Sequence, residues 1–167
     1  LEDWAVPVVL ANHNSPRQAV LSGTVEEIEA AETRLREAKI RFQRLPVATA
    51  FHSSVVSSAA EPFEQFLGEL KLKTPQMPVY ANSTAAPYAK KAQRIRKVLA
   101  EQITRPVRFC EQIEAMYAAG ARTFLEVGPN AILTRLVGDI LGDRPHAAIN
   151  LDAKGKNGLT SLWRALG

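Results

Sequence analysis

The side chains of this chain that could do nucleophilic chemistry are three histidines, one cysteine and several serines. A histidine serves as a general base when a serine or cysteine lies within hydrogen-bond reach and a third group orients its ring. The motif G-x-S-x-G, which exposes a serine nucleophile on a strand-to-helix turn, is absent from the sequence. The sequence therefore predicts a general base whose nucleophile lies outside these residues, which is half of an active site.

His52 is the best placed of the three histidines, because it stands between two differently patterned segments, just before a predicted helix. A lone histidine in such a place is more often a packed structural residue than a base. The identity of its neighbours, Ala50-Phe51-His52-Ser53, therefore matters. His13 and His146 have no supporting context, and we expect them at the surface or in turns.

Length and composition predict a globular protein. The 167 residues suffice for one core, or for two small cores that share a boundary, and 46% of them are apolar and 23% charged. No apolar run reaches the roughly 18 residues of a membrane span. Residues 1–9 carry acids and no basic segment, so we expect no signal peptide. The single cysteine, Cys110, excludes an internal disulfide and is typical of a cytoplasmic protein.

The net charge of +4 comes largely from one basic segment. Its members are Lys90, Lys91, Arg94, Arg96 and Lys97. Such a segment is most often a solvated helix face. The alternative is a docking patch for an acidic partner, because opposite charge speeds association. Nucleic acid is a weaker interpretation, since no aromatic residues alternate with these bases to stack on nucleotides.

The first 46 residues predict two strands, a helix and a third strand. Apolar runs over 6–12 and 18–22 flank the turn residues of 14–16, and Thr24 with Glu27 forms a capping box for the helix that follows. Alternation over 40–45 predicts a half-buried strand. This is an incomplete α+β sandwich, which would normally include a further β-α unit upstream.

After Pro46 the pattern predicts helices alternating with short strands. We expect a helix over 55–70 with Pro62 in its first turn or at a bend, a strand over 78–82, and helical faces over 95–103 and 109–117 that end at Gly120. A strand over 123–127, a helix over 131–141, a strand over 147–151 and a helix over 159–166 follow. The expected buried residues of the 131–141 helix are Leu133, Leu136, Val137 and Ile140. This alternation predicts parallel β-α-β units.

Four segments of the chain, in order, resemble the malonyl-CoA:acyl carrier protein transacylases and the acyltransferase domains of polyketide and polyunsaturated fatty acid synthases. The segments are residues 11–23 (A-N-H-N-S-P-R-Q-A-V-L-S-G), 50–53 (A-F-H-S), 102–107 (Q-I-T-R-P-V) and 126–129 (E-V-G-P). The chain's ending, residues 150–167, is also similar to the close of such domains in large synthases. The resemblance covers only the second half of the domain.

This resemblance implies an α/β fold in two parts. Residues 1–46 would be part of a ferredoxin-like (α+β) small subdomain, and residues 47–167 the C-terminal portion of an α/β-hydrolase-like large subdomain. His52 would be the base that takes the proton of a serine nucleophile and returns it to the departing thiol. Gln102 would accept the other ring proton of that histidine with its backbone carbonyl, although it could also be a plain helix residue. The serine, an oxyanion-hole glutamine and a malonyl-binding arginine would all lie upstream.

The resemblance also implies substrates and partners. Phe51 matches a position associated with substrate choice, where a ring favours malonyl over methylmalonyl groups, although Thr49 replaces the usual histidine and Phe51 could equally be a core residue. Asn14 and Asn82 match polar positions near the cleft, although either could be only a turn or strand-end residue. Lys90, Lys91, Arg94 and Lys97 are candidates for docking the acyl carrier protein. Coenzyme A thioester would be a substrate, with no cofactor and no metal. The alternative is a catalytically silent docking module within a synthase.

Overall fold

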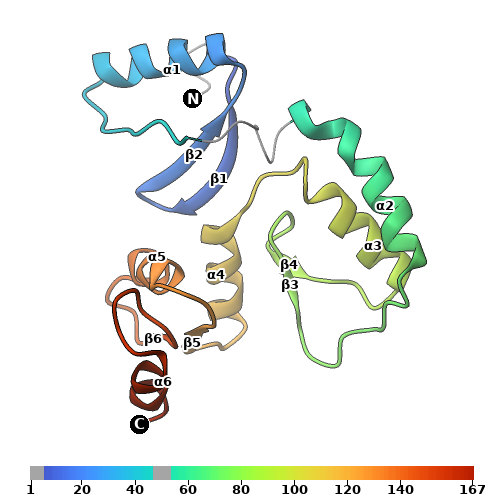
Figure 1. The fold of residues 1–167 in the computed structure, drawn as a ribbon, viewed down its shortest axis with the longest axis vertical. Helices are drawn as coiled ribbons and strands as arrows, with labels where there is room; N and C mark the ends of the chain where they lie inside the picture. The colour runs from blue at the N-terminus through green and yellow to red at the C-terminus, as the bar shows by residue number, and fades with distance from the viewer. Residues whose placement is uncertain (1–5, 47–53) are drawn as a thin grey trace.

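The computed structural model describes residues 6–46 and 54–167, which form three groups of elements (Figure 1). A hairpin with helix α1 forms one end, α2 and α3 lie to one side with a short hairpin, and the remaining elements lead to the C-terminus. In chain order the elements are β1 (Val9–Ser15), β2 (Gln18–Ser22), α1 (Val25–Glu37), η2 (Ser54–Ala59), α2 (Ala60–Glu69), β3 (Tyr80–Ala81), β4 (Ala86–Pro87), α3 (Ala92–Glu101), α4 (Phe109–Ala118), β5 (Thr123–Glu126), α5 (Ile132–Leu141), β6 (Ala147–Asn150) and α6 (Gly158–Leu166).

The N-terminal hairpin pairs β1 with β2 in antiparallel register, as predicted. The register skips a residue on β1 twice, between Leu10 and Asn12 and between His13 and Ser15. Ala11 and Asn14 are therefore bulge residues, and such bulges bend a strand and increase its local twist. Helix α1 then begins at the predicted capping box.

In this capping box the Glu27 amide donates to Thr24 Oγ1 at 3.3 Å, and the Thr24 amide donates to Glu27 Oε2 at 2.7 Å. These bonds satisfy backbone donors that the first turn of a helix cannot satisfy itself.

Helices α2 and α3 pack together, and Arg96 of α3 joins them. Its Nε donates to the Leu67 carbonyl at 3.0 Å, and a terminal nitrogen donates to the Leu70 carbonyl at 2.9 Å. Carbonyls at a helix C-terminus lack intrahelical partners and attract positive charge. Arg96 therefore fastens the end of α2 and is not available as part of an exposed basic face.

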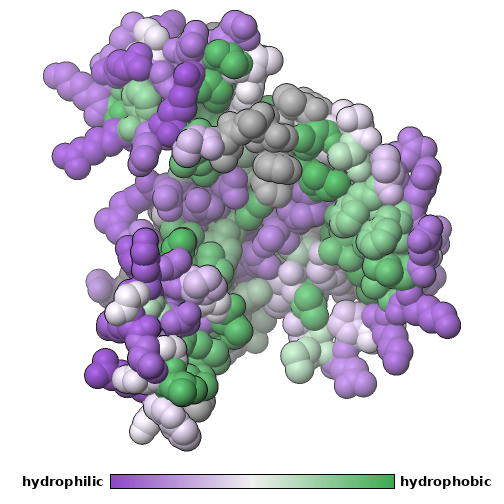
Figure 2. Space-filling view, in the orientation of Figure 1, coloured by the Kyte–Doolittle hydropathy of each residue, from purple (hydrophilic) through white to green (hydrophobic). Residues whose placement is uncertain are grey.

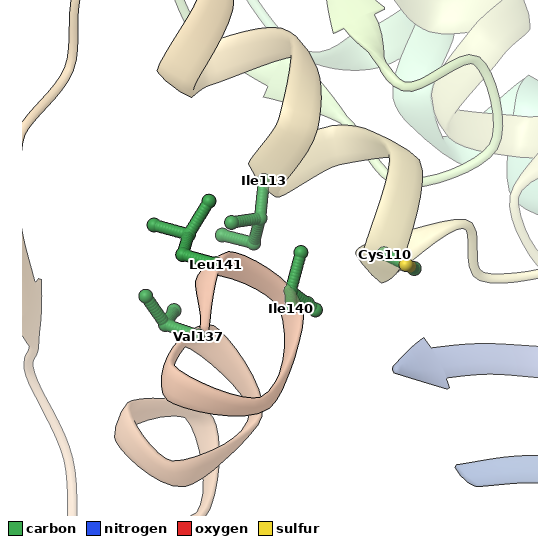
Figure 3. Packing of buried hydrophobic residues seen from close by; sticks show 5 residues of the cluster. All are labelled: Cys110, Ile113, Val137, Ile140 and Leu141. Carbon is green, nitrogen blue, oxygen red and sulfur yellow. The ribbon is translucent and has the colours of Figure 1, made fainter. Parts of the chain in front are cut away.

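The main core lies between α4, α5 and the parallel pair β5–β6. Its buried cluster consists of Cys110, Ile113, Val137, Ile140 and Leu141. Figure 3 shows Ile140 and Leu141 of α5 beside Ile113 of α4, with Val137 farther along the same helix. β5 and β6 run parallel, with Thr123 opposite Ala147 and Glu126 opposite Asn150, which confirms the predicted β-α-β unit. Phe124 and Ala148 turn one face of this sheet toward the cluster.

The predicted strand over 40–45 is wrong. Residues 40–46 form no strand, and Ile40, Phe42 and Leu45 are 48%, 38% and 49% exposed. The segment instead lies along α1, where Arg44 pairs with Glu32 at 2.9 Å. Alternation predicts which side chains would share a face, but a strand also needs a hydrogen-bonding partner. No strand in the described part of the chain pairs with this segment.

Two predictions about helices also need correction. The helix expected from residue 55 starts as a 3₁₀ segment, η2, and becomes α-helical only at Ala60, with Pro62 in its first turn. Leu133 is 45% exposed, whereas Leu136, Val137 and Ile140 are buried as predicted.

The two-residue strand β4 was not anticipated. No helix within residues 6–46 and 54–167 is long and apolar enough to cross a bilayer.

Candidate active site

The candidate base His52 and the candidate specificity residue Phe51 lie outside the described residues, together with the rest of 47–53. The structure does describe the other segments on which the prediction of an active site rests. These are the β1–β2 hairpin with Asn14, the turn with Asn82, and the segment 102–107 with Gln102.

Gln102 is the C-terminal cap of α3. Its amide donates to the carbonyls of Val98 at 3.1 Å and Leu99 at 3.3 Å, so the helix continues to this residue. Its side-chain Oε1 accepts a hydrogen bond from the Ser83 amide at 3.0 Å. The side chain therefore ties the turn after β3 to the end of α3, a structural role that the sequence did not predict.

Val107 joins the segment 102–107 to β1. The His13 amide donates to the Val107 carbonyl and the Val107 amide donates to the Ala11 carbonyl, both at 2.8 Å, in a parallel bridge centred on Asn12. The next amide, that of Arg108, donates to the Asn82 carbonyl at 2.9 Å. Three segments far apart in the sequence thus meet at one backbone junction.

The two candidate asparagines lie on either side of this junction. Asn14 is a half-buried bulge residue of β1, two positions after the bridged Asn12. The side chain of Asn82 is exposed, and its carbonyl holds Arg108. The structure therefore brings the segments that carry Asn14, Asn82 and Gln102 together.

His13 is not the unsupported surface residue that the sequence indicated. It is half-buried in β1, and its Nδ1 lies 3.2 Å from Glu111 Oε1. Arg108 Nε lies 3.6 Å from the same oxygen. Burial alone would raise the pKa of Glu111, but its backbone hydrogen bond and its contacts with His13 and Arg108 lower the pKa below its ordinary value. His146 is also half-buried, with Nδ1 2.7 Å from the Arg144 carbonyl.

Glu126 was not singled out as a functional residue, yet it organises the loop after β5. Its carboxylate accepts hydrogen bonds from the amides of Ile132 and Leu133 at 3.1 Å and of Thr134 at 2.8 Å, and from the Thr134 hydroxyl at 2.7 Å. Burial alone would raise the pKa of Glu126, but these bonds outweigh it and lower the pKa below its ordinary value. The feature of the sequence that could have identified Glu126 is an acidic residue shortly before a predicted helix.

The candidate docking residues lie at the start of α3 and along one side of it. Lys90, Lys91, Arg94 and Lys97 are exposed. Arg94 and Lys97 border an open hollow of roughly 510 Å³ between α3 and the β3–β4 hairpin, which Tyr88 and Glu101 also line. Burial raises the pKa of the Tyr88 phenol. Lys97 lies 3.9 Å from Glu101, at the limit of an ion pair.

The described residues contain no group of three or more His, Cys, Asp or Glu side chains that could hold a metal ion.

Residues 1–153 match the family described as Acyl transferase domain. The malonyl CoA-acyl carrier protein transacylase of Bacillus subtilis is 40% identical over 132 residues, which is 78% of this chain and 41% of that protein. The chain thus spans less than half the length of this relative.

Solved structures of the same kind superpose closely. The malonyl CoA-acyl carrier protein transacylase from Clostridium perfringens has a TM-score of 0.87 at 31% identity, covering 99% of this chain and 50% of that one. A type II polyketide synthase malonyl-transacylase, solved in complex with its acyl-carrier protein, has a TM-score of 0.84 at 29% identity and covers 95% of this chain and 49% of that one.

Proposed function

The chain belongs to the Acyl transferase domain family, and on this basis we propose that it is the C-terminal half of a domain that transfers a malonyl-type group from coenzyme A to an acyl carrier protein. The observation that carries the proposal is the match over residues 1–153 with relatives about twice as long. The junction that joins Ala11 and His13 to Val107, and Arg108 to Asn82, supports it, because it assembles the segments that the family resemblance singled out.

The reaction divides between this chain and the residues that would precede it. A serine from the upstream half attacks the thioester carbonyl of malonyl-CoA while His52 takes the serine proton. The tetrahedral intermediate collapses, the carbon–sulfur bond breaks, and His52 returns the proton to the departing thiol of coenzyme A. The thiol of the carrier protein then attacks the acyl-serine by the same steps. Coenzyme A thioester is the substrate, and the proposal includes no cofactor and no metal.

Gln102 has a positioning role in this proposal. Its backbone carbonyl accepts the second ring proton of His52 and so fixes the tautomer that leaves the other nitrogen free to act as the base. The position of Gln102 as the C-terminal cap of α3, with its side chain accepting a hydrogen bond from the Ser83 amide, supports a rigid placement of that carbonyl. Asn14 and Phe51 would contact the acyl group, with the Phe51 ring favouring an unbranched malonyl unit.

We also propose the two-part architecture, with residues 1–46 in a ferredoxin-like small subdomain and 47–167 in an α/β-hydrolase-like large one. The antiparallel β1–β2 hairpin with α1 supports the first, and the parallel β5–α5–β6 unit supports the second. The two parts share an interface, since Arg17 of the hairpin pairs with Asp139 of α5. A cytoplasmic location completes the proposal, and the single thiol, Cys110, supports it.

Carrier docking is assigned to Lys90, Lys91, Arg94 and Lys97. Their exposure along one side of α3, beside an open hollow, supports an encounter surface for an acidic carrier protein. Arg96 is excluded from this surface because both of its described hydrogen bonds fasten α2.

The proposed function is tested in a complete domain, made by placing the upstream half of the Bacillus subtilis relative before Leu1. We expect His52→Ala to slow malonyl transfer by on the order of 100-fold or more, the contribution of a general base. His146→Ala is the control and should retain the rate, because His146 lies outside the junction. Near-normal transfer by His52→Ala, with the fold intact by circular dichroism, would show that His52 is not the base, whereas no transfer by the unmodified complete domain would favour the alternative of a catalytically silent docking module.

A further inference from the structure

Asn14 is a residue of β1 that strand pairing does not hold in place. In the hairpin register His13 lies opposite Ala19 and Ser15 lies opposite Gln18, so the register gives Asn14 no partner on β2. A bulge residue of this kind is left outside the ladder, and its position depends on the residues that flank it. Ser15 is 1% exposed and is fixed by burial. The position of Asn14 therefore depends on what holds His13.

Contacts from α4 and the segment before it hold His13. Its amide donates to the Val107 carbonyl at 2.8 Å, and its Nδ1 lies 3.2 Å from Glu111 Oε1. Glu111 is ionised at neutral pH, because its pKa lies below its ordinary value, so the carboxylate accepts and we assign the proton to His13 Nδ1. Arg108, whose amide donates to the Asn82 carbonyl, places its Nε 3.6 Å from the same carboxylate oxygen. One oxygen of Glu111 thus contacts residues of two segments that meet at the junction.

Glu111 differs from the next acidic residue of the same helix, Glu114. Both oxygens of Glu114 accept hydrogen bonds from Arg144, at 2.8 Å and 2.6 Å, which is the bidentate geometry of a stabilising ion pair. The Oε2 of Glu111 is instead buried and has no hydrogen-bond partner in the described part of the chain. A buried oxygen without a partner costs free energy. Glu111 is therefore placed for its contact with His13 and not for the greatest stability.

The boundary between the hairpin and the rest of the chain is polar on this side. Figure 2 shows hydrophilic residues where the hairpin adjoins α4 and α5. A second side-chain pair across this boundary joins Arg17 to Asp139, but the Arg17 side chain is 77% exposed and such pairs contribute little. The side chains of His13 and Glu111 are 34% and 39% exposed, so their contact is better shielded from water. It is accordingly the stronger of the two side-chain attachments.

We propose that Glu111 is a positioning residue for acyl transfer. Its carboxylate holds the side chain of His13, and His13 holds the adjacent bulge, so that Asn14 stays at a fixed place beside residues 102–107. The inference rests on the proposed function, in which Asn14 contacts the acyl group. A contact made equally in the bound substrate and in the transition state affects KM and not kcat. Loss of the Glu111 carboxylate should therefore weaken binding of malonyl-CoA without slowing the chemical step.

The first test reads the attachment of the hairpin by hydrogen exchange in the 167-residue chain. The probe is the Val107 amide, which donates to the Ala11 carbonyl of β1 at 2.8 Å. The reference is the Leu151 amide, which donates to the carbonyl of the last residue of β5 and reports opening of the main core. The ratio of the two exchange rates separates local release of the hairpin from global unfolding.

We expect Glu111→Gln and His13→Phe to raise the exchange rate of the Val107 amide relative to Leu151 by roughly 10-fold, the effect of losing one hydrogen bond to a charged group. His13→Asn keeps an N–H donor near the position of Nδ1 and should leave the ratio close to that of the unmodified chain. Glu114→Gln is the matched control. It removes an ion-paired carboxylate from the same helix, away from the hairpin, and should leave the ratio unchanged.

The second test measures malonyl loading by the complete domain, with the upstream half of the Bacillus subtilis relative placed before Leu1. Glu111→Gln and His13→Phe should raise KM for malonyl-CoA by roughly 10-fold and leave kcat nearly unchanged. His13→Asn should keep KM near that of the unmodified domain, which a role of the imidazole ring in packing would not allow. Glu114→Gln should lower the Tm and leave KM unchanged.

An unchanged exchange ratio in Glu111→Gln and His13→Phe would overturn the inference whatever the loading. An equal effect of Glu114→Gln on the ratio or on KM would also overturn it, because Glu111 would then be an ordinary stabilising residue. Faster exchange with an unchanged KM would reject the positioning role and leave the proposed acyl transfer intact. Faster exchange in the chain, with no loading by the unmodified complete domain, would keep the attachment of the hairpin by Glu111 and reject the proposed acyl transfer.

Discussion

At the scale of single residues, Glu126 supplies the hydrogen-bond acceptor that the N-terminal cap of α5 lacks. The N-cap residue of this helix, Ala131, has no side chain that could accept a hydrogen bond from the first turn. The carboxylate of Glu126 reaches across the loop and accepts from three consecutive amides. A negative charge at this end of a helix also interacts favourably with the helix dipole. Glu126 therefore fixes the end of β5 and the beginning of α5 relative to each other.

Glu126→Gln should lower the free energy of unfolding by about 1 to 2 kcal/mol, because hydrogen bonds to a charged acceptor are replaced by weaker ones to a neutral amide and water screens part of the effect. Chemical denaturation of the 167-residue chain measures this. Glu64→Gln, an exposed residue of α2, is the control and should change little. An equal effect of the two substitutions would show that the carboxylate of Glu126 is not needed.

The lowered pKa of Glu126 also predicts a pH dependence. A carboxyl group whose pKa is lower in the folded state stabilises the fold above its unfolded pKa of about 4.3, and this contribution is lost as the pH falls through the folded pKa. Stability of the chain should therefore decrease on acidification below about pH 5, and the decrease should be smaller in Glu126→Gln. Unfolding curves between about pH 7 and pH 3 give the dependence of the free energy of unfolding on pH for the unmodified chain and for Glu126→Gln. The same dependence in both proteins would contradict the stabilising role of the Glu126 carboxylate.

Phe51 carries the prediction about substrate choice. A single methyl group in an apolar pocket changes kcat/KM by roughly 10- to 200-fold. We expect the complete domain to prefer malonyl-CoA over methylmalonyl-CoA by a factor in this range, and Phe51→Ser to narrow the preference mainly by losing malonyl rate. A competition assay with both thioesters measures this. Equal loading by the unmodified domain would place Phe51 in the core and away from the acyl group.

At the scale of elements, the sequence predicts what local periodicity determines. The parallel β5–α5–β6 unit, the capping box of α1 and the end of α4 at Gly120, whose φ is +99°, all depend on residues close in sequence. The prediction of a strand over 40–45 was wrong because strand pairing depends on a partner distant in the sequence. The predicted burial of Leu133 was wrong for a similar reason, since periodicity places a residue on a helix face but does not say how far the core extends along that face.

The candidate site shows the same division. Its motifs indicated which segments to compare, but the bridge between Asn12 and Val107 and the contact between His13 and Glu111 join residues distant in the chain. No periodicity or composition in a single sequence reports such pairs. The hydrogen bond from Ser83 to the side chain of Gln102 was missed because a helix-terminal glutamine has many possible partners. The roles of His52 and Phe51 stay predictions, since both lie outside the described residues.

Two neighbouring arginines of α3 allow stability and carrier docking to be separated. Arg96→Ala should lower the free energy of unfolding by about 1 to 2 kcal/mol, because it removes two hydrogen bonds to the end of α2. Arg94→Ala should leave stability unchanged but raise KM for the carrier protein in the complete domain, most clearly at low salt. Denaturation and carrier-dependent kinetics measure the two effects. An unchanged KM in Arg94→Ala would remove Arg94 from the docking surface.

At the scale of the whole molecule, the chain holds a candidate base but offers no activated nucleophile among its described residues. The only thiol, Cys110, is 7% exposed within the core. Burial raises the pKa of this thiol, and the nearby carboxylates of Glu111 and Glu114 raise it further against the opposing effect of Arg144. Since the thiolate is the reactive form, Cys110 is chemically inert at neutral pH. A serine without an oxyanion hole would likewise gain little rate from His52 alone.

The isolated 167-residue chain should therefore be catalytically silent. Incubation with malonyl-CoA and carrier protein should leave the mass of the chain unchanged and should transfer no malonyl group above the background rate. The same chain behind the upstream half should carry a malonyl group on a serine of that half, which peptide mapping by mass spectrometry would locate. A malonylated peptide from within residues 1–167 would mean that the nucleophile is in this chain after all, and that the division of the active site between two halves of the domain is wrong.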